Sequence, residues 1–142
     1  MSADLAPFLH QILLAAQQLT APYRARANMT SAEYAGLQHL AQHRDGLTPG
    51  QLGARLAITS GSVTKLVDRL EARRLARRIR KPHADRRSVT VVATREGVNL
   101  ISRDLEQLID ELDGAGTPPL DPGQREVVGR LLASVRPPAA SA

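Results

Sequence analysis

The stretch 59–75, TSGSVTKLVDRLEARRL, is the feature that most limits what this chain can fold into. Four of its apolar residues recur at positions i, i+3, i+4 and i+7, the spacing that places side chains on one face of an α-helix. These residues are Val63, Leu66, Val67 and Leu70. The opposite face is polar, and Thr59 or Ser60 is available as the N-cap. The stretch therefore predicts an amphipathic helix with one side on a core and the other in solvent.

A second predicted helix precedes this one across a short turn at 57–60. The sequence TPGQ at 48–51 combines a capping box with proline at the first helical position, so it predicts a short helix with Leu52 and Leu56 inside. Two short helices joined by a tight turn are typical of a helix-turn-helix, whose second helix enters the major groove of DNA. Helix pairs of this size also occur in proteins that never bind DNA, so the pair alone leaves both interpretations open.

Positive charge is concentrated in the middle third of the chain. The formal net charge is +5, and the segment 48–97 contains twelve Lys or Arg residues against four Asp or Glu. Positive charge confined to one segment indicates a site for a polyanion, because a basic surface kept for solubility would be spread more evenly.

The residues after the amphipathic helix are predicted to form a β-hairpin. Segments 76–80 and 88–93 are the strands, and 81–87 is a polar turn that contains Pro. Six cations lie within eleven positions of this hairpin: Arg77, Arg78, Arg80, Lys81, Arg86 and Arg87. Their mutual repulsion costs energy unless an anion relieves it. A solvated hairpin is the plainer interpretation, but a phosphate backbone beside a narrow minor groove would supply the anion.

Another helix is predicted to begin before this region. Thr30 and Glu33 have the spacing of a capping box, and Met29 and Tyr34 that of a hydrophobic staple. The Asp-Gly pair at 45–46 ends this helix.

Three further helices are predicted outside the helix-turn-helix. The first covers 4–26, the second follows Thr94 and has its apolar stripe at 98–112, and the last has its stripe at 127–135. Because these stripes have no partner within the helix-turn-helix, we expect them to bury one another across the twofold axis of a homodimer.

Several functional classes are excluded by what the chain lacks. It has no cysteine, which removes disulfides, thiol redox sensing and thiolate metal sites. Only His39 and His43 have the spacing to chelate a metal together, and no third ligand is evident, so we expect neither a metal nor another cofactor. No catalytic pattern stands out, so an enzyme is not expected. No signal peptide or apolar span is visible, and we expect a cytoplasmic protein without a membrane partner.

The order of these elements resembles the MarR family of winged-helix transcriptional regulators. The resemblance is carried by LTPGQLGARLAITSGSVTKLVDRLEARRLARR at 47–78 and by DRRSVTVVATREG at 85–97. Four residues of the second segment fall on the family's wing signature: Asp85, Arg87, Thr94 and Gly97. The chain departs from the pattern at Arg74, where the family usually has Gly, and so forfeits a left-handed cap worth about 1 kcal/mol. Ala93 also stands where the family prefers Leu.

The resemblance implies a mainly α fold with a small β-hairpin wing. A single domain would comprise a winged helix-turn-helix at 30–97, dimerisation helices at 1–27 and 98–136, and a flexible tail at 137–142. It also implies a homodimer that binds a pseudo-palindromic operator in double-stranded DNA, as a repressor that a small, often aromatic, effector releases.

Candidate DNA-binding residues lie on the predicted recognition helix and on the hairpin. They are Thr59, Ser60, Ser62, Thr64, Lys65 and Arg69 on the helix, and Arg80, Lys81, Arg86 and Arg87 on the hairpin. Lys65 or Arg69 is the expected reader of a guanine edge, with Asp68 orienting one of them.

The wing and the effector cleft carry further candidates. Arg86 is the expected minor-groove residue, while Arg87 pairs with Asp85 to fix the wing's shape, and the opposite assignment stays open. His10, Tyr23 and Tyr34 are candidates for an effector cleft, with core packing as the alternative for the two tyrosines.

A sequence-specific DNA-binding regulator is therefore the favoured interpretation. The alternative is a winged-helix protein-interaction subunit with only weak, sequence-blind affinity for DNA. The hairpin argues against that alternative, because a wing that docks on a protein has no reason to collect six cations.

Overall fold

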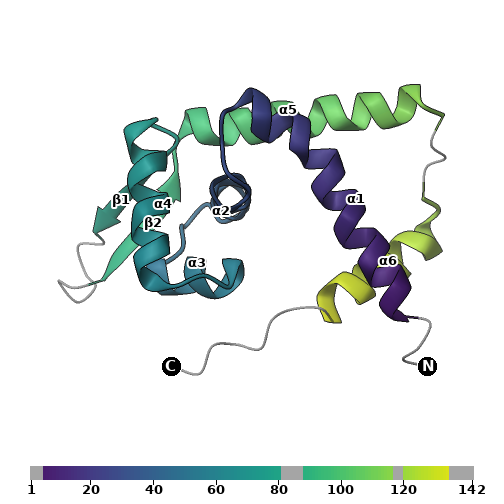
Figure 1. Cartoon of the computed structure of the whole chain (residues 1–142), viewed down its shortest axis with the longest axis horizontal. Coiled ribbons are helices and arrows are strands. Elements are labelled where there is room, and N and C mark those ends of the chain that lie inside the picture. Colours follow the sequence, from purple (N-terminus) through teal and green to yellow (C-terminus); the bar gives the residue numbers. More distant parts are fainter. Residues whose placement is uncertain (1–4, 81–87, 117–119, 135–142) are drawn as a thin grey trace.

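The computed structural model describes residues 5–80, 88–116 and 120–134 of the 142-residue chain, and these form six helices and one β-hairpin (Figure 1). In chain order they are α1 (Leu5–Arg26), α2 (Ser31–Gln42), α3 (Pro49–Leu56), α4 (Ser60–Ala72), β1 (Ala76–Arg80), β2 (Val89–Ala93), α5 (Arg95–Gly114) and α6 (Pro122–Ser134). The predicted fold class, mainly α with a small β-hairpin wing, is confirmed. The expected tail at 137–142 lies outside the described residues.

Local capping determines where the helices of the central region begin. Thr30 Oγ1 accepts the backbone N–H of Glu33 at 3.2 Å, and Glu33 Oε2 accepts the N–H of Thr30 at 3.0 Å. The same reciprocal pair forms between Thr48 and Gln51, at 3.1 and 2.9 Å. Both predicted capping boxes are confirmed. Because each box closes over three residues, it can be recognised from sequence without knowledge of tertiary contacts.

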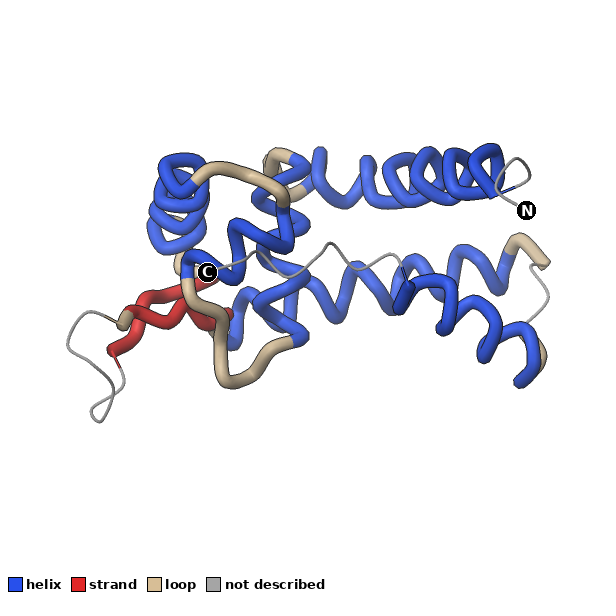
Figure 2. Tube along the Cα trace, turned by 90° about the horizontal axis from the view of Figure 1, so that it is seen from below, coloured by secondary structure: helices blue, strands red, loops and turns tan. Residues whose placement is uncertain are grey.

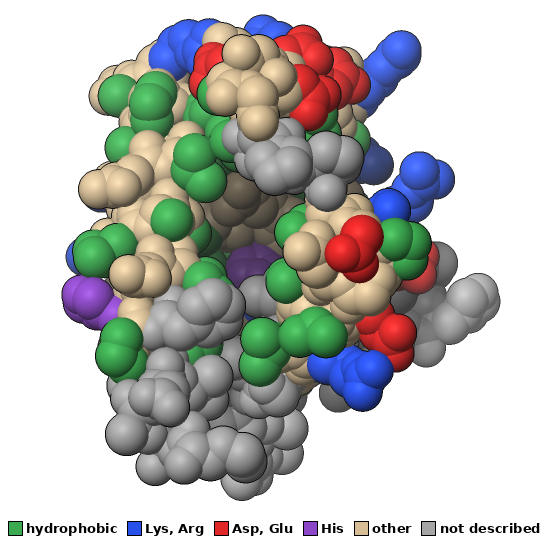
Figure 3. Space-filling view, turned by 90° about the vertical axis from the view of Figure 1, so that its right-hand side faces the viewer, with side chains coloured by type: hydrophobic (Ala, Val, Ile, Leu, Met, Phe, Trp, Pro, Cys, Tyr) green, Lys and Arg blue, Asp and Glu red, His purple; other side chains and the backbone are tan. Residues whose placement is uncertain are grey.

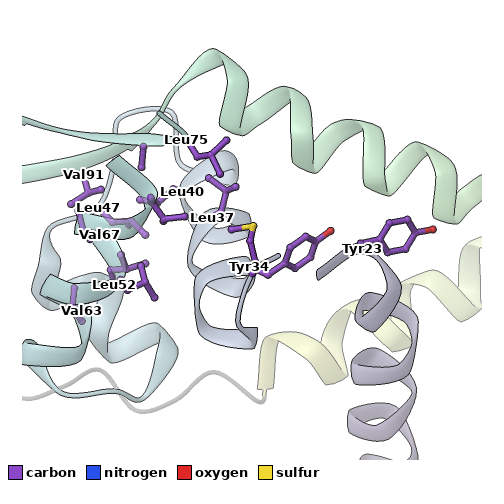
Figure 4. Close-up of a cluster of buried hydrophobic side chains, with 14 residues drawn as sticks. Tyr23, Tyr34, Leu37, Leu40, Leu47, Leu52, Val63, Val67, Leu75 and Val91 are labelled. Atoms are coloured by element: carbon purple, nitrogen blue, oxygen red, sulfur yellow. The ribbon is translucent and has the colours of Figure 1, made fainter. Parts of the chain in front are cut away.

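Helix α4 has the predicted buried face. Val63, Leu66, Val67 and Leu70 are all buried, and Thr59 caps the helix by accepting the N–H of Ser62 at 3.3 Å. The buried face packs into one core with residues of α2, α3 and β2, in which Leu37, Leu40, Leu52, Val63 and Val91 are almost fully enclosed (Figure 4). The core thus lies between α2, the helix-turn-helix and the root of the hairpin, and it extends to Tyr23 at the end of α1.

The hairpin is antiparallel, and Ala76 pairs with Ala93 and Arg80 with Val89. The second strand begins at Val89, one residue later than predicted. A further contact was not predicted: Leu47, in the loop before α3, exchanges two backbone hydrogen bonds with Val91, at 2.9 and 2.8 Å. This bridge fastens the hairpin to the helix-turn-helix.

The junction between the hairpin and α5 explains two residues of the wing signature. Thr94 Oγ1 accepts the N–H of Gly97 at 3.1 Å, which caps α5, and it donates to the carbonyl oxygen of Arg74 at 2.6 Å. A Cβ atom on Gly97 would lie only 2.1 Å from the carbonyl oxygen of Leu75. The signature therefore marks a place where α5 passes very close to the chain that leaves α4.

Three helices extend beyond this central body. α5 runs away from the hairpin, and α1 and α6 lie on the side of the molecule opposite to it (Figures 1 and 2). Hydrophobic side chains gather on both sides of a hollow at that end (Figure 3). Exposed large hydrophobic residues on these helices include Leu13, Leu14 and Leu19 of α1, Val98, Leu105, Ile109 and Leu112 of α5, and Val127 of α6. Within the described ranges, no helix combines the length and the apolar character that crossing a membrane requires.

Candidate nucleic-acid interface

The solvent face of α4 brings the predicted helix residues together. With about 3.6 residues per turn, Lys65 projects almost opposite the buried stripe. Ser62 and Arg69 flank it and line a groove together with it, and the remaining candidates on this helix are also exposed: Thr59, Ser60 and Thr64. Two of them are engaged locally as well, because Thr59 caps the helix and Thr64 Oγ1 donates to the carbonyl oxygen of Ser60 at 3.1 Å.

Asp68 does not orient Arg69 or Lys65, and that prediction is wrong. Its Oδ1 instead forms an ion pair with Arg78 Nη2 of β1 at 2.7 Å. Adjacent residues of a helix project about 100° apart, so Asp68 and Arg69 point to different sides of α4.

Arg69 is held by a carboxylate of another helix. Its Nη1 donates to Glu33 Oε1 at 2.9 Å; the Arg69 side chain is 62% exposed and that of Glu33 is 8% exposed. Burial raises the pKa of Glu33, but the hydrogen bond from the Thr30 backbone and the charge of Arg69 together outweigh it and hold that pKa below its usual value. Sequence reasoning assigned Glu33 to the cap of α2 alone, since nothing local links it to a residue 36 positions later.

A shallow groove of about 230 Å³ lies beside this ion pair, between the start of α2 and the exposed face of α4. Its lining includes the apolar side chains of Ile58 and Leu66 as well as Lys65, Glu33 and Arg69. The Arg69 side of α4 therefore borders an open groove.

Arg78 fastens the other edge of α4 to the hairpin. Besides Asp68, its guanidinium pairs with Glu71, and its backbone N–H donates to Glu71 Oε1 at 2.7 Å. Partial burial lowers the pKa of Arg78, but the hydrogen bonds that its guanidinium donates to Asp68 and Glu71 raise that pKa above its usual value. Arg78 therefore has its charge neutralised by two carboxylates of α4. Its place in the hairpin cluster had instead indicated a contact to a phosphate.

Of the remaining hairpin cations, only Arg77 and Arg80 of β1 lie among the described residues, and both are exposed. Arg80 lies on the same face of the strand as Arg78, which contacts α4, because side chains alternate along a strand. The candidates Lys81, Asp85, Arg86 and Arg87 lie outside the described residues, so their roles stay predictions.

The end of α4 also contacts the junction between α1 and α2. The guanidinium of Arg73, the residue after α4, donates to the backbone carbonyl oxygens of Ala27 and Asn28. Arg69 and Arg73, one helical turn apart, thus both hold α4 against this junction.

The two tyrosines proposed for an effector cleft contact α5. Tyr34 OH donates to the buried Asp104 Oδ2 at 3.0 Å, and Tyr23 OH donates to Glu111 Oε2 at 3.2 Å. Both rings lie at the α1 side of the core (Figure 4). Burial is the main cause that raises the pKa of Tyr34, and the Asp104 carboxylate adds to it. His10 is exposed and lies thirteen residues before Tyr23 on the same helix, which is roughly 20 Å along its axis.

His39 and His43, the pair considered as metal ligands, contact each other through a hydrogen bond. His43 Nδ1 lies 2.6 Å from the carbonyl oxygen of His39, a hydrogen bond at the end of α2. Burial is the main cause that lowers the pKa of His39, with Arg55 and His43 adding to it. Over the described part of the chain, no three His, Cys, Asp or Glu side chains are placed to hold one metal ion.

Comparison with known proteins gives a partial match to one family model and a set of similar folds. Residues 27–88 match a family model described as the MarR family. No curated protein sequence matches the chain. NadR in complex with 4-hydroxyphenylacetate is 26% identical, with a TM-score of 0.77 over 93% of this chain and 92% of that one. A MarR family protein from Bacillus stearothermophilus is 23% identical, with a TM-score of 0.73 over 94% and 91%. A MepR–DNA complex from S. aureus is 21% identical, with a TM-score of 0.62 over 90% and 98%.

Proposed function

We propose that this chain, whose residues 27–88 match the MarR family model, is a winged-helix DNA-binding regulator, and more specifically a repressor that binds a pseudo-palindromic operator as a homodimer. In this proposal α4 enters the major groove and the hairpin lies beside it on the phosphate backbone. The observation that carries it is the exposed polar face of α4, with Lys65 at its centre, beside the exposed cations of β1.

The apolar surface of the projecting helices supports the homodimer. Leu105 and Ile109 of α5 are 55% and 48% exposed, and Leu13 of α1 is 63% exposed. An apolar surface of this kind is rare on a monomer and marks an interaction site. A second copy of the chain supplies equivalent stripes, and a twofold axis would present the two α4 helices to successive turns of one duplex.

A small aromatic effector is a further part of the proposal. NadR, whose structure contains 4-hydroxyphenylacetate, is 26% identical to this chain over almost its whole length. Tyr23 and Tyr34 lie where α1, α2 and α5 meet, but both are buried in the core and their hydroxyls already donate to Glu111 and Asp104, so an effector would have to displace these contacts to bind them. We assign the two tyrosines to the effector site; His10 lies roughly 20 Å from Tyr23 along α1, too far for one small aromatic molecule to contact both.

The test is selection of DNA by the purified full chain from a pool of random duplexes, followed by sequencing of the retained molecules. We expect an inverted repeat with half-site centres about one helical turn, roughly 34–36 Å, apart. Affinity for this duplex should fall steeply with salt, because phosphate contacts release counterions. Retention without any enriched sequence would instead support the protein-interaction alternative.

Two variants make this test specific to α4. Lys65→Ala should relax the sequence preference of the retained DNA. Arg125→Ala removes one exposed cation from α6 and serves as the matched control, which should select the same sequence as the wild type. Equal effects of the two substitutions would mean that overall charge, and not α4, determines the binding.

A further inference from the structure

We propose that Glu33 is a positioning residue for base recognition, because its carboxylate fixes the guanidinium of Arg69 at the edge of α4 in the orientation that reads one base pair of each half-site. The inference rests on the proposed function and assigns the specificity of that function to a residue outside the recognition helix.

The two oxygens of Glu33 have separate partners. Oε2 accepts the backbone N–H of Thr30 at 3.0 Å, and Oε1 accepts Arg69 Nη1 at 2.9 Å. The first contact anchors the carboxylate to the start of α2, and Glu33 is only 6% exposed. Because the carboxylate is anchored, the second oxygen holds the guanidinium at a fixed place.

Arg69 remains accessible while it is held. Its side chain is 62% exposed, and the groove between α2 and α4 opens beside it. An arginine carries five N–H donors in a planar fork, so a contact through Nη1 to Glu33 leaves further donors for a second partner. A guanidinium that presents two donors to O6 and N7 of guanine makes the commonest specific contact to a base. One that is already fixed loses less conformational entropy when it binds.

The cap of α2 does not itself require a negative charge. Helix α3 has the same reciprocal box, in which neutral Gln51 takes the place of Glu33 and its Oε1 accepts the Thr48 N–H at 2.9 Å. Glu and Gln both satisfy a capping box. The charge of Glu33 therefore serves the contact to Arg69, and Glu33→Gln separates the two roles.

The experiment compares the sequences that full-length variants select from a pool of random duplexes. Glu33→Gln should lose about tenfold preference at one base pair per half-site, the range that a single bidentate contact provides, and keep the preference elsewhere. Arg69→Ala should lose preference at the same base pair. The double variant should lose no more than Arg69→Ala alone, since the two residues act as one unit. Lys65→Ala, the control on the same helix, should affect a different base pair and combine additively with Glu33→Gln.

Two kinds of result would contradict the role of Glu33. If Glu33→Gln selects the wild-type sequence with unchanged preference, or if its loss falls at a different base pair from that of Arg69→Ala, Glu33 does not position Arg69. If the wild-type chain enriches no sequence, the proposed function fails and this inference fails with it.

A second measurement does not depend on the folding of any variant. Nitrogen-15 relaxation of arginine side chains in the wild-type chain should show a restricted Arg69 guanidinium and a freely moving Arg77 guanidinium, since Arg77 is exposed on β1. Equal mobility of the two groups would overturn the proposal.

Discussion

Arg74 adopts a backbone conformation that residues with a Cβ atom rarely adopt. Its φ is +58°, in the left-handed region, at the turn between α4 and β1. The departure from the family's glycine could be seen in the sequence, and the structure shows that the chain keeps the glycine-like geometry. Its carbonyl oxygen accepts the hydroxyl of Thr94, so the turn cannot relax without loss of that contact.

Arg74→Gly should therefore stabilise the protein by about 1 kcal/mol, because glycine occupies the left-handed region without steric cost. Urea unfolding of the full chain measures this. Arg74→Ala is the control, since it removes the same charge but retains the strain. If Arg74→Ala raised the free energy of unfolding as much as Arg74→Gly does, the stabilisation would come from loss of charge repulsion and not from relief of backbone strain.

Tyr34 and Tyr23 make similar hydrogen bonds in different surroundings. Asp104, the partner of Tyr34, is 4% exposed, whereas Glu111, the partner of Tyr23, is exposed and also accepts from Gln107. Tyr34→Phe should cost about 1–3 kcal/mol, because it leaves a buried carboxylate without its donor. Tyr23→Phe should cost less than about 1 kcal/mol, because water can replace the hydroxyl at the exposed Glu111 carboxylate. Thermal unfolding compares the two, and equal losses would contradict this account.

For single residues, a contact could be predicted from the sequence only when its two residues lie close together along the chain. The capping pairs of Thr30 and Thr48 were predicted because their partners lie three residues away. The Tyr34–Asp104 and Glu33–Arg69 contacts join residues 70 and 36 positions apart, and no local pattern marks them. Asp68 was assigned to the wrong partner for the same reason, since its arginine lies on β1.

At the scale of elements, caps and periodicity gave the helices to within a few residues. Thr59 and Thr94 are strong signals because each can cap the helix that begins directly after it. The stripe of α4 is a strong signal because it repeats the period of the helix. The bridge between Leu47 and Val91 was missed, because a pair of single residues has no period to detect.

The root of the hairpin allows a test at this scale. Arg78→Ala removes ion pairs to Asp68 and Glu71, so the β1 amides should exchange hydrogen several-fold faster, which corresponds to a local loss of about 1 kcal/mol. Exchange in the middle of α5 should not change. Arg80→Ala removes an exposed cation from the same strand and is the control, and a similar acceleration in both variants would contradict the assigned role of Arg78.

At the scale of the whole molecule, the sequence predicted the fold class but not how the helices project. Apolar stripes on α1, α5 and α6 predict surfaces that must be buried, and in the structure each of these helices carries exposed large hydrophobic side chains. Their partner is a second chain in our proposal, and periodicity cannot distinguish burial within a chain from burial between chains.

Leu105→Glu should therefore yield a monomer in sedimentation experiments at concentrations where the wild type is a dimer, because it places a charge on the apolar surface. The wild-type Tm should rise with protein concentration, and that of the variant should not. Arg103→Glu, an exposed position on the other side of α5, should remain dimeric. A wild type that is monomeric at all concentrations would remove the basis for the dimer.

The contacts on both edges of α4 have a mechanical consequence. Arg69 and Arg73 join it to the α1–α2 junction, and Arg78 joins it to β1, so a tilt of α4 would have to break these contacts or carry the neighbouring elements with it. In the proposed dimer, the winged helix-turn-helix of each protomer would therefore move as one unit. The distance between the two copies of α4 would then depend on the angle between the protomers. A molecule that binds between α1 and α5 and pushes them apart could therefore release DNA without contacting any side chain that faces the DNA.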